Sequence, residues 1–154
     1  FQDRSKYNKE LFKIGVRHLE GAGTFDKMPS NYHLEAARSY YHSMAKSFEE
    51  TDWKGILYLY DLQLGREFSP MVALNRIVPF AKVHGPTKAM EELEKLTNRT
   101  NFENSGLFFA IKAELEKELG EHQCTATLKK AIALSENILV KRHLSRKLHQ
   151  SPSR

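Results

Sequence analysis

The sequence contains one cysteine, Cys124, among 154 residues. One cysteine cannot build an internal disulfide framework or a zinc site made of cysteine pairs, and such scarcity fits a reducing compartment. No apolar run approaches the roughly 20 residues of a membrane-spanning helix, and no secretory signal core is visible. None of the eight glycines lies in a phosphate-binding loop pattern. We therefore expect a cytoplasmic protein that does not enter a membrane.

Signals for β-strands are equally scarce. β-Branched residues are sparse, and no Asn-Gly or Asp-Gly hairpin turn occurs. Glycine and proline instead divide the chain into segments of helical length, with Ser30, Asp52 and Ser69 placed as N-caps. We predict an all-α fold with about eight helices, at roughly 3–20, 30–46, 52–64, 69–83, 85–96, 101–119 and 120–135, with a last one holding Val140, Leu144 and Leu148.

Part of this helical pattern repeats. Gly85 and Gly120 lie 35 residues apart, close to the period of about 34 of a tetratricopeptide repeat. Each glycine is followed by a small residue and, four positions later, by leucine: Ala89 and Leu93, then Cys124 and Leu128. A small residue lets paired helices approach, and the larger one fills the space above it. The spacing predicts a right-handed, tetratricopeptide-like array of helix hairpins.

We expect a single helical-repeat domain over residues 1–154. Residues 1–28 would form an N-terminal linker or helix, and residues 29–136 three helix hairpins. Residues 137–154 would form a capping helix and tail, because the end unit of an array needs a polar outer face. The side chains expected to be largely buried between hairpins are Trp53, Tyr60, Leu74, Phe80, Leu93, Phe108, Leu115 and Leu128. Pro79 inside the fourth helix predicts a kink that frees the carbonyl of Asn75.

The charge is distributed unevenly. The chain has 24 Lys and Arg against 19 Asp and Glu, and all the acidic residues lie at or before Glu136. The net charge of +5 therefore belongs to the last 18 residues. Four of the basic residues form a weak basic tail: Lys141, Arg142, Arg146 and Lys147. This tail is either the solvated face of the cap or a weak electrostatic attractor of DNA or an acidic protein surface. Because the remainder of the chain is neutral, we expect no specific DNA binding.

No catalytic or metal-binding constellation is visible. None of the seven histidines forms a His-Glu-x-x-His pattern or pairs with another histidine four residues away. No Gly-x-Ser-x-Gly element presents a nucleophile. Cys124 fits the small position of the repeat better than a reactive thiol. We predict that the chain is not an enzyme and that it has no catalytic residues, metal or cofactor.

A series of short motifs resembles one known family. They follow in the order Tyr32-His33-Leu34-Glu35-Ala36-Ala37, Thr51-Asp52-Trp53, Leu59-Tyr60-Asp61, Ser69-Pro70, Val72-Ala73-Leu74-Asn75-Arg76 and Gly85-Pro86. This order resembles the C-terminal extension of a group of bacterial extracytoplasmic-function sigma factors, an extension described as tetratricopeptide-like. The resemblance continues more loosely to the last helix and departs from the family pattern at Pro79.

The resemblance implies a function. The chain would be a regulatory, protein-interaction domain that modulates transcription initiation by RNA polymerase. Its partners would be its own N-terminal sigma domains, RNA polymerase, or both. The chain begins at Phe1 rather than Met, so we expect a fragment or a processed product. Two alternatives remain: a free-standing peptide-binding scaffold, and a small-molecule sensor with a pocket among Tyr32, His33, Tyr40, Tyr41 and Trp53.

A candidate interaction surface follows from polar and aromatic residues that helix packing does not require. We place it on the first two hairpins, at His33, Glu35, His42, Asp52, Trp53, Asn75 and Arg76. Arg76 can form a two-pronged pair with a carboxylate. That carboxylate would be Glu35 or Asp52 within the domain, or a residue of a partner. Target promoters, the regulatory signal, the sign of regulation and the oligomeric state do not follow from the sequence.

Overall fold

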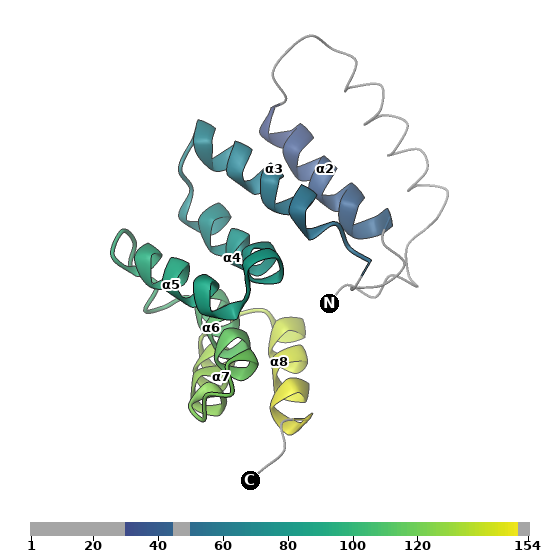
Figure 1. Ribbon diagram of the computed structural model, residues 1–154. Helices are drawn as coiled ribbons and strands as arrows, with labels where there is room; N and C mark the ends of the chain where they lie inside the picture. The colour runs from purple at the N-terminus through teal and green to yellow at the C-terminus, as the bar shows by residue number, and fades with distance from the viewer. Residues whose placement is uncertain (1–29, 45–49, 151–154) are drawn as a thin grey trace. The chain divides into compact units, whose positions relative to one another are not determined.

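The computed structural model describes residues 30–44 and 50–150 (Figure 1). These residues form seven α-helices and no strand. The predicted all-α class is thus confirmed for this part of the chain. The helix expected at about 3–20 lies outside the described residues. The chain divides into two compact units, residues 1–68 and residues 69–154, which we describe separately.

In the first unit, α2 (Asn31–Met44) packs against α3 (Trp53–Arg66). Near the end of α2, Cζ of Tyr41 lies 3.2 Å from where a Cβ on Gly55, at the start of α3, would be. One turn earlier in α2, the guanidinium of Arg38 donates a hydrogen bond of 2.6 Å to Gln63, near the end of α3. The two helices therefore run antiparallel.

The second unit holds five helices: α4 (Pro70–His84), α5 (Pro86–Thr97), α6 (Gly106–Glu118), α7 (Cys124–Leu134) and α8 (Ile138–Gln150). Consecutive partners pack on each other as α4 with α5, α6 with α7, and α7 with α8, and α6 also contacts α4 and α5 (Figure 1). One core lies among α4, α5 and α6, and a smaller one among α6, α7 and α8. Phe109 packs against both cores.

The helix starts follow the capping residues. The carboxylate of Asp52 accepts a 2.9 Å hydrogen bond from the amide of Gly55, and the hydroxyl of Ser69 accepts one of 3.5 Å from Val72. Pro70 then occupies the first position of α4, where its missing N–H is harmless. Ser30 precedes α2 as predicted, but its hydroxyl lies 2.6 Å from Nδ1 of His33. Ser30 therefore engages an imidazole ring in addition to any capping through its backbone.

The two repeat glycines lie in turns between helices. Gly85 has φ +90° and Gly120 has φ +75°, and they are the residues with positive φ within the described ranges. L-residues with a Cβ rarely adopt this conformation, so glycine is required for both turns. α7 begins at Cys124, later than expected, because the amide of Glu121 bonds back to the carbonyl of Glu116 and prolongs the turn.

Five of the eight predicted core side chains are buried: Leu74, Leu93, Phe108, Leu115 and Leu128. Trp53, Tyr60 and Phe80 are only half-buried. Trp53 and Tyr60 carry a polar ring group that keeps contact with water. Phe80 packs against the edge of the α4–α6 core. Pro79 is buried inside α4, which continues without interruption to His84. The rigid ring is therefore accommodated within one helix.

Candidate functional site

The outer side of α2 carries the first part of the predicted interaction surface. His33 and Glu35 are both exposed. His33 is held by Ser30, whose backbone amide also lies 3.2 Å from the ring Nδ1. Tyr32, Glu35, Ala36 and Ser39 are likewise exposed and follow the i, i+3, i+4, i+7 spacing of one helical stripe. The side chain of the predicted residue His42 lies outside the described part of the structure.

The second part of that surface lies at the other end of the hairpin. Asp52 and Trp53 begin α3, beside the Tyr41 end of α2, whereas His33 and Glu35 lie near the start of α2. At 1.5 Å per residue, the seven positions from Leu34 to Tyr41 separate them by roughly 10 Å. The Asp52 carboxylate is engaged as the cap of α3. These residues consequently form two patches rather than one cluster.

A polar group that the sequence did not predict lies between these ends. Buried Gln63 accepts the hydrogen bond from Arg38, and the guanidinium of Arg38 also lies 4.3 Å from the ring centre of Tyr60. Burial raises the pKa of Tyr60, with the Arg38 charge acting in the opposite direction. Arg38 of α2 thus links α2 to α3 through its contacts with Gln63 and Tyr60. A basic residue flanked by Ala37 and Ser39 gives no sequence signal for such a role.

Arg76 and Asn75 belong to α4 in the second unit. Nη1 of Arg76 lies 3.6 Å from the Glu92 carboxylate of α5, and its guanidinium lies 4.8 Å from the ring centre of Phe80. Glu92 also bonds Lys95 at 2.7 Å. An internal ion pair of the kind expected for Arg76 is therefore present within the second unit, with Glu92 as its carboxylate.

Asn75 has a local partner as well. Its side-chain amide donates a 2.9 Å hydrogen bond to the carbonyl of Met71, one turn earlier in α4. Asn75 is half-buried. The amide therefore helps to cover the backbone of the first turns of α4, ahead of Pro79. Both predicted site residues of the second unit thus have contacts within it.

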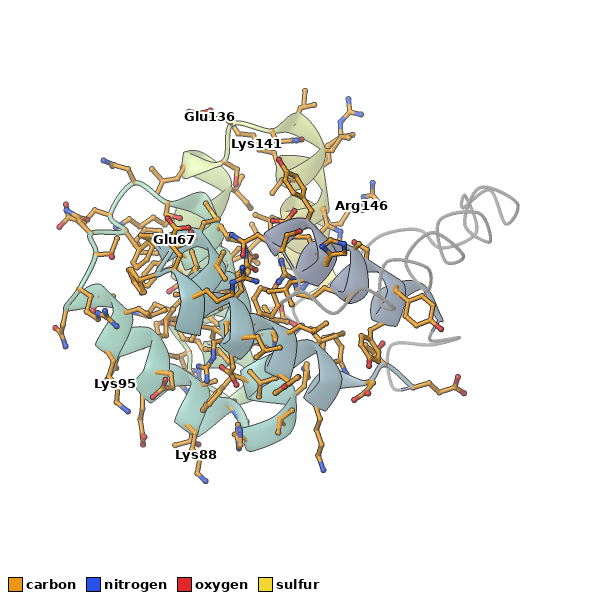
Figure 2. The ribbon with its side chains drawn as sticks, turned by 90° about the horizontal axis from the view of Figure 1, so that it is seen from above. Glu67, Lys88, Lys95, Glu136, Lys141 and Arg146 are labelled. Atoms are coloured by element: carbon orange, nitrogen blue, oxygen red, sulfur yellow. The ribbon has the colours of Figure 1, made fainter. Side chains whose placement is uncertain are left out.

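The basic residues of α8 differ from one another in exposure. Lys147 forms a 2.8 Å ion pair with Glu114 of α6, while Arg142 and Arg146 are exposed. In Figure 2, Lys141 and Arg146 of α8 lie at the opposite side of the view from Lys88 and Lys95 of α5. Burial and the nearby charges of Lys147 and Arg146 lower the pKa of His143. The tail is therefore partly tied to α6 and partly open to solvent.

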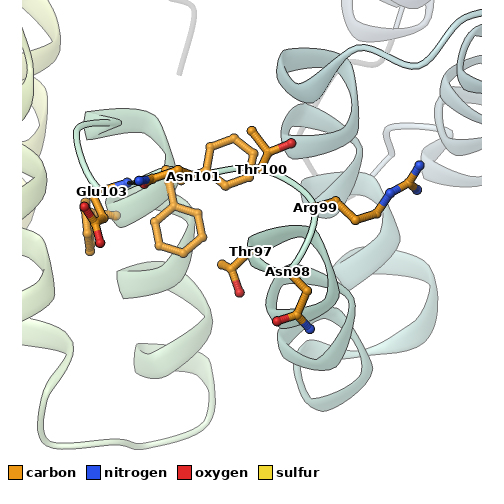
Figure 3. Close-up of a pocket in the computed structure, with 9 residues that line it drawn as sticks. Thr97, Asn98, Arg99, Thr100, Asn101 and Glu103 are labelled. Atoms are coloured by element: carbon orange, nitrogen blue, oxygen red, sulfur yellow. Dashed lines mark hydrogen bonds between the residues drawn. The ribbon is translucent and has the colours of Figure 1, made fainter.

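A cavity of about 490 Å³ lies at the loop that joins α5 to α6 (Figure 3). Phe102, Phe108 and Phe109 supply its apolar wall, and the rings of Phe102 and Phe108 stack 5.4 Å apart. Its polar rim consists of Thr97, Asn98, Arg99, Thr100, Asn101 and Glu103. Arg99 extends away from the other labelled side chains. The sensor alternative placed a pocket elsewhere, and Tyr32 of that set is 84% exposed.

One buried acidic side chain was not predicted from the sequence. The side chain of Glu116 on α6 is fully buried, and both its carboxylate oxygens lack a hydrogen-bond partner. Nζ of Lys112, one turn earlier, lies 3.9 Å away. In the described parts of the chain, no group of three or more His, Cys, Asp or Glu is arranged to hold a metal ion. Across the same residues, no helix has the length and apolarity to cross a bilayer.

One relative was found by comparison with known proteins. The chain is 31% identical over 139 residues to an uncharacterized protein of Rhizobium meliloti (strain 1021). The match covers 88% of the chain and 32% of the relative, so the chain spans about a third of that protein's length. No protein-family model matches the chain, and no solved structure matches it.

Proposed function

We propose that this chain is a regulatory, protein-interaction domain of an extracytoplasmic-function sigma factor, with its hairpins in a tetratricopeptide-like array. The observation that carries the proposal is the position of the motifs on which the resemblance rests. Asp52-Trp53 starts α3, Ser69-Pro70 starts α4, and Gly85-Pro86 starts α5. The resemblance therefore concerns residues that set the helix boundaries. A match at helix boundaries supports a shared architecture more strongly than a match in amino-acid composition would.

The repeat positions add support for the array. Gly85 and Gly120, 35 residues apart, both lie in turns with positive φ. At equivalent offsets, Leu93 is 1% exposed and Leu128 is 9% exposed. Ala89, the small residue that follows Gly85 in the repeat pattern, is fully buried. Its counterpart Cys124 is only half-buried. The two leucines therefore have equivalent environments, as stacked hairpins require, whereas the two small residues do not.

The relative in Rhizobium meliloti supports a domain within a longer protein. About two thirds of that relative lies outside the matched region. A free-standing peptide-binding scaffold, the first alternative, would not need those additional residues. A regulatory extension attached to sigma domains would need them.

The outer stripe of α2 is the best contact surface for a protein partner. Tyr32 is 84% exposed, and Glu35 lies one turn further along the same stripe. Exposed tyrosines commonly supply much of the binding energy of an interface, and a neighbouring carboxylate adds specificity for a basic residue of the partner. Asp52, Asn75 and Arg76 have structural partners within the chain. We therefore assign the contact to Tyr32 and Glu35.

Binding of the purified chain to core RNA polymerase and to the N-terminal sigma domains tests this proposal. We expect Tyr32→Ala to weaken binding by at least about fivefold, because it removes an exposed aromatic anchor. Tyr58→Ala is the matched control, since Tyr58 is 61% exposed on α3 of the same unit. Absence of binding to both partners, or equal losses in the two variants, would contradict the proposal.

The cavity at the α5–α6 loop is the observation that favours the sensor alternative. Its volume of about 490 Å³ is in the range of small-molecule sites, and aromatic walls with a polar rim are typical of them. A fragment screen by NMR would detect such a function as shifts confined to Phe102, Phe108 and Phe109. Shifts spread over the whole chain, or none, would argue against it.

A further inference from the structure

The outer face of α8 combines exposed aliphatic and basic side chains. Ile138 and Leu139 are 63% and 68% exposed, and Arg142, Arg146 and His149 are exposed further along the helix. At 100° per residue, these five positions fall within one stripe about 100° wide. We call this stripe, Ile138, Leu139, Arg142, Arg146 and His149, the α8 outer face.

The opposite side of α8 packs against the second unit through Leu144 and Leu148, while Val140, in the first turn of that side, is 44% exposed. Leu144 is buried against Ala113, Leu128 and Ala131, and Leu148 packs against the same cluster. Asn137 caps the helix by accepting hydrogen bonds from the amides of Leu139 and Val140, at 2.8 and 3.4 Å. The orientation of α8 is therefore fixed by its inner side and its cap. The α8 outer face is presented by this fixed helix.

A capping helix that only keeps the array soluble should expose polar groups. Two large aliphatic side chains on the same stripe as two arginines do not serve solubility. Arginine with apolar neighbours is instead typical of protein interfaces. No Asp or Glu occurs from residue 137 onward, so the positive charge of this face is not neutralised within α8.

We propose that the α8 outer face binds an acidic segment of a partner protein. Arg142 and Arg146 are one turn apart, about 6 Å along the helix axis. This spacing suits two carboxylates one turn apart on a partner helix, each held by two parallel hydrogen bonds. Leu139, one turn before Arg142, would contact an aliphatic side chain beside those carboxylates. This inference does not depend on the sigma-factor proposal, which concerns α2.

Two other classes of partner fit the face less well. A helix that lies in a membrane surface needs an apolar stripe along most of its length, and here Leu144 and Leu148 face the protein core. Nucleic acid would use the arginines but would leave Ile138 and Leu139 without a role, and α8 has no Phe, Tyr or Trp for stacking. Charge and apolar exposure together therefore favour an acidic protein segment.

Fluorescence anisotropy with the whole chain tests the proposal. The probe is an alanine-based helical peptide with two glutamates one turn apart and a leucine one turn further on. The control peptide carries lysines in place of the two glutamates. We expect binding of the acidic peptide only, and a loss of affinity when salt is raised from about 50 to about 500 mM. Failure of the acidic peptide to bind at low salt would overturn the proposal.

Substitutions locate the binding face. Arg142→Ala combined with Arg146→Ala should weaken binding at least about tenfold, and Leu139→Ala about threefold. The charge-matched control is Lys88→Ala combined with Lys129→Ala, which removes two exposed lysines from other helices. Because all the substituted side chains are exposed, the melting temperature of each variant should be unchanged. Equal loss in the control would overturn the proposal. Tighter binding to anionic vesicles or duplex DNA than to the peptide, reduced by the same arginine changes, would overturn it too.

Discussion

At the scale of single residues, burial decides which side chains stabilise the fold. Leu93 is 1% exposed in the core shared by α4, α5 and α6, whereas Leu107 is 37% exposed on α6. Leu93→Ala should lower the free energy of unfolding by about 2–5 kcal/mol, because a buried truncation loses apolar contacts and leaves a cavity. Leu107→Ala should cost less than about 1 kcal/mol. Urea denaturation measures both, and equal losses would contradict this assignment of the core.

Arg76 has an internal partner, so its removal should affect stability. The Arg76 and Glu92 side chains are 20% and 31% exposed, and water therefore screens their 3.6 Å ion pair. We expect a coupling energy of about 0.5–1 kcal/mol between Arg76→Ala and Glu92→Ala in a double-mutant cycle. If the losses of stability in the two single variants add up to the loss in the double variant, the ion pair contributes nothing to the free energy of unfolding. An unchanged melting temperature with altered transcription would instead assign Arg76 to a partner contact.

The partner of Arg76 could not be predicted from the sequence. Glu92 lies on α5, and its position depends on how the turn at Gly85 sets α5 against α4. The sequence names carboxylates such as Glu35 and Asp52 by their chemical type and gives no signal for Glu92. The same applies to Gln63, an ordinary polar residue in the sequence that is buried and accepts a hydrogen bond from Arg38. Contacts between helices require the packing geometry, whereas caps and turns are local.

At the scale of the helices, the repeat glycines set the turns. Gly85→Ala and Gly120→Ala should each destabilise the fold by about 1–2 kcal/mol, because alanine is strained at positive φ. Gly65→Ala is the matched control. Gly65 lies inside α3 with open space around it, so alanine should stabilise the fold by about 0.5–1 kcal/mol. Chemical denaturation of the three variants checks the signs, and a stabilising Gly85→Ala would contradict the turn.

α8 should make stability depend on pH through His143. Burial, with the charges of Lys147 and Arg146, lowers the pKa of His143 below its ordinary value of 6.5. A lowered pKa in the folded state stabilises the protein above pH 6.5, and this contribution is lost as the pH falls through the folded pKa. His143→Gln should therefore reduce the loss of stability between about pH 7 and pH 5. Identical pH profiles for the two proteins would contradict this role.

The helices themselves were largely predictable. Asp52, Ser69-Pro70 and Gly85-Pro86 mark three helix starts at the residues where the structure places them. The start of α7 was misplaced because the turn after Gly120 extends to Gln123, and no capping side chain marks its end. The cavity beside Phe102 was not predicted, because a polar loop gives no signal for the conformation it adopts.

At the scale of the whole molecule, the two proposals assign different tasks to different helices. The outer stripe of α2 would contact the sigma domains or polymerase, and the α8 outer face would bind an acidic segment. The sequence alone placed the interaction residues by their chemical type. The structure shows that Asp52, Asn75 and Arg76 have internal partners, whereas His33 and Glu35 of the predicted surface are exposed. Tyr32, which was not predicted as part of that surface, is exposed beside them.

Reconstituted transcription tests the central claim most directly. The proposed sigma factor, with this chain as its C-terminal part, is combined with core RNA polymerase, and promoter-dependent transcripts are measured. We expect Tyr32→Ala combined with Glu35→Ala to change transcript yield at least about fivefold with an unchanged melting temperature, and Tyr58→Ala to leave it unaltered. If the full-length protein supports no promoter-dependent transcription, or if deletion of residues 30–150 leaves the transcription unaffected, the account is wrong.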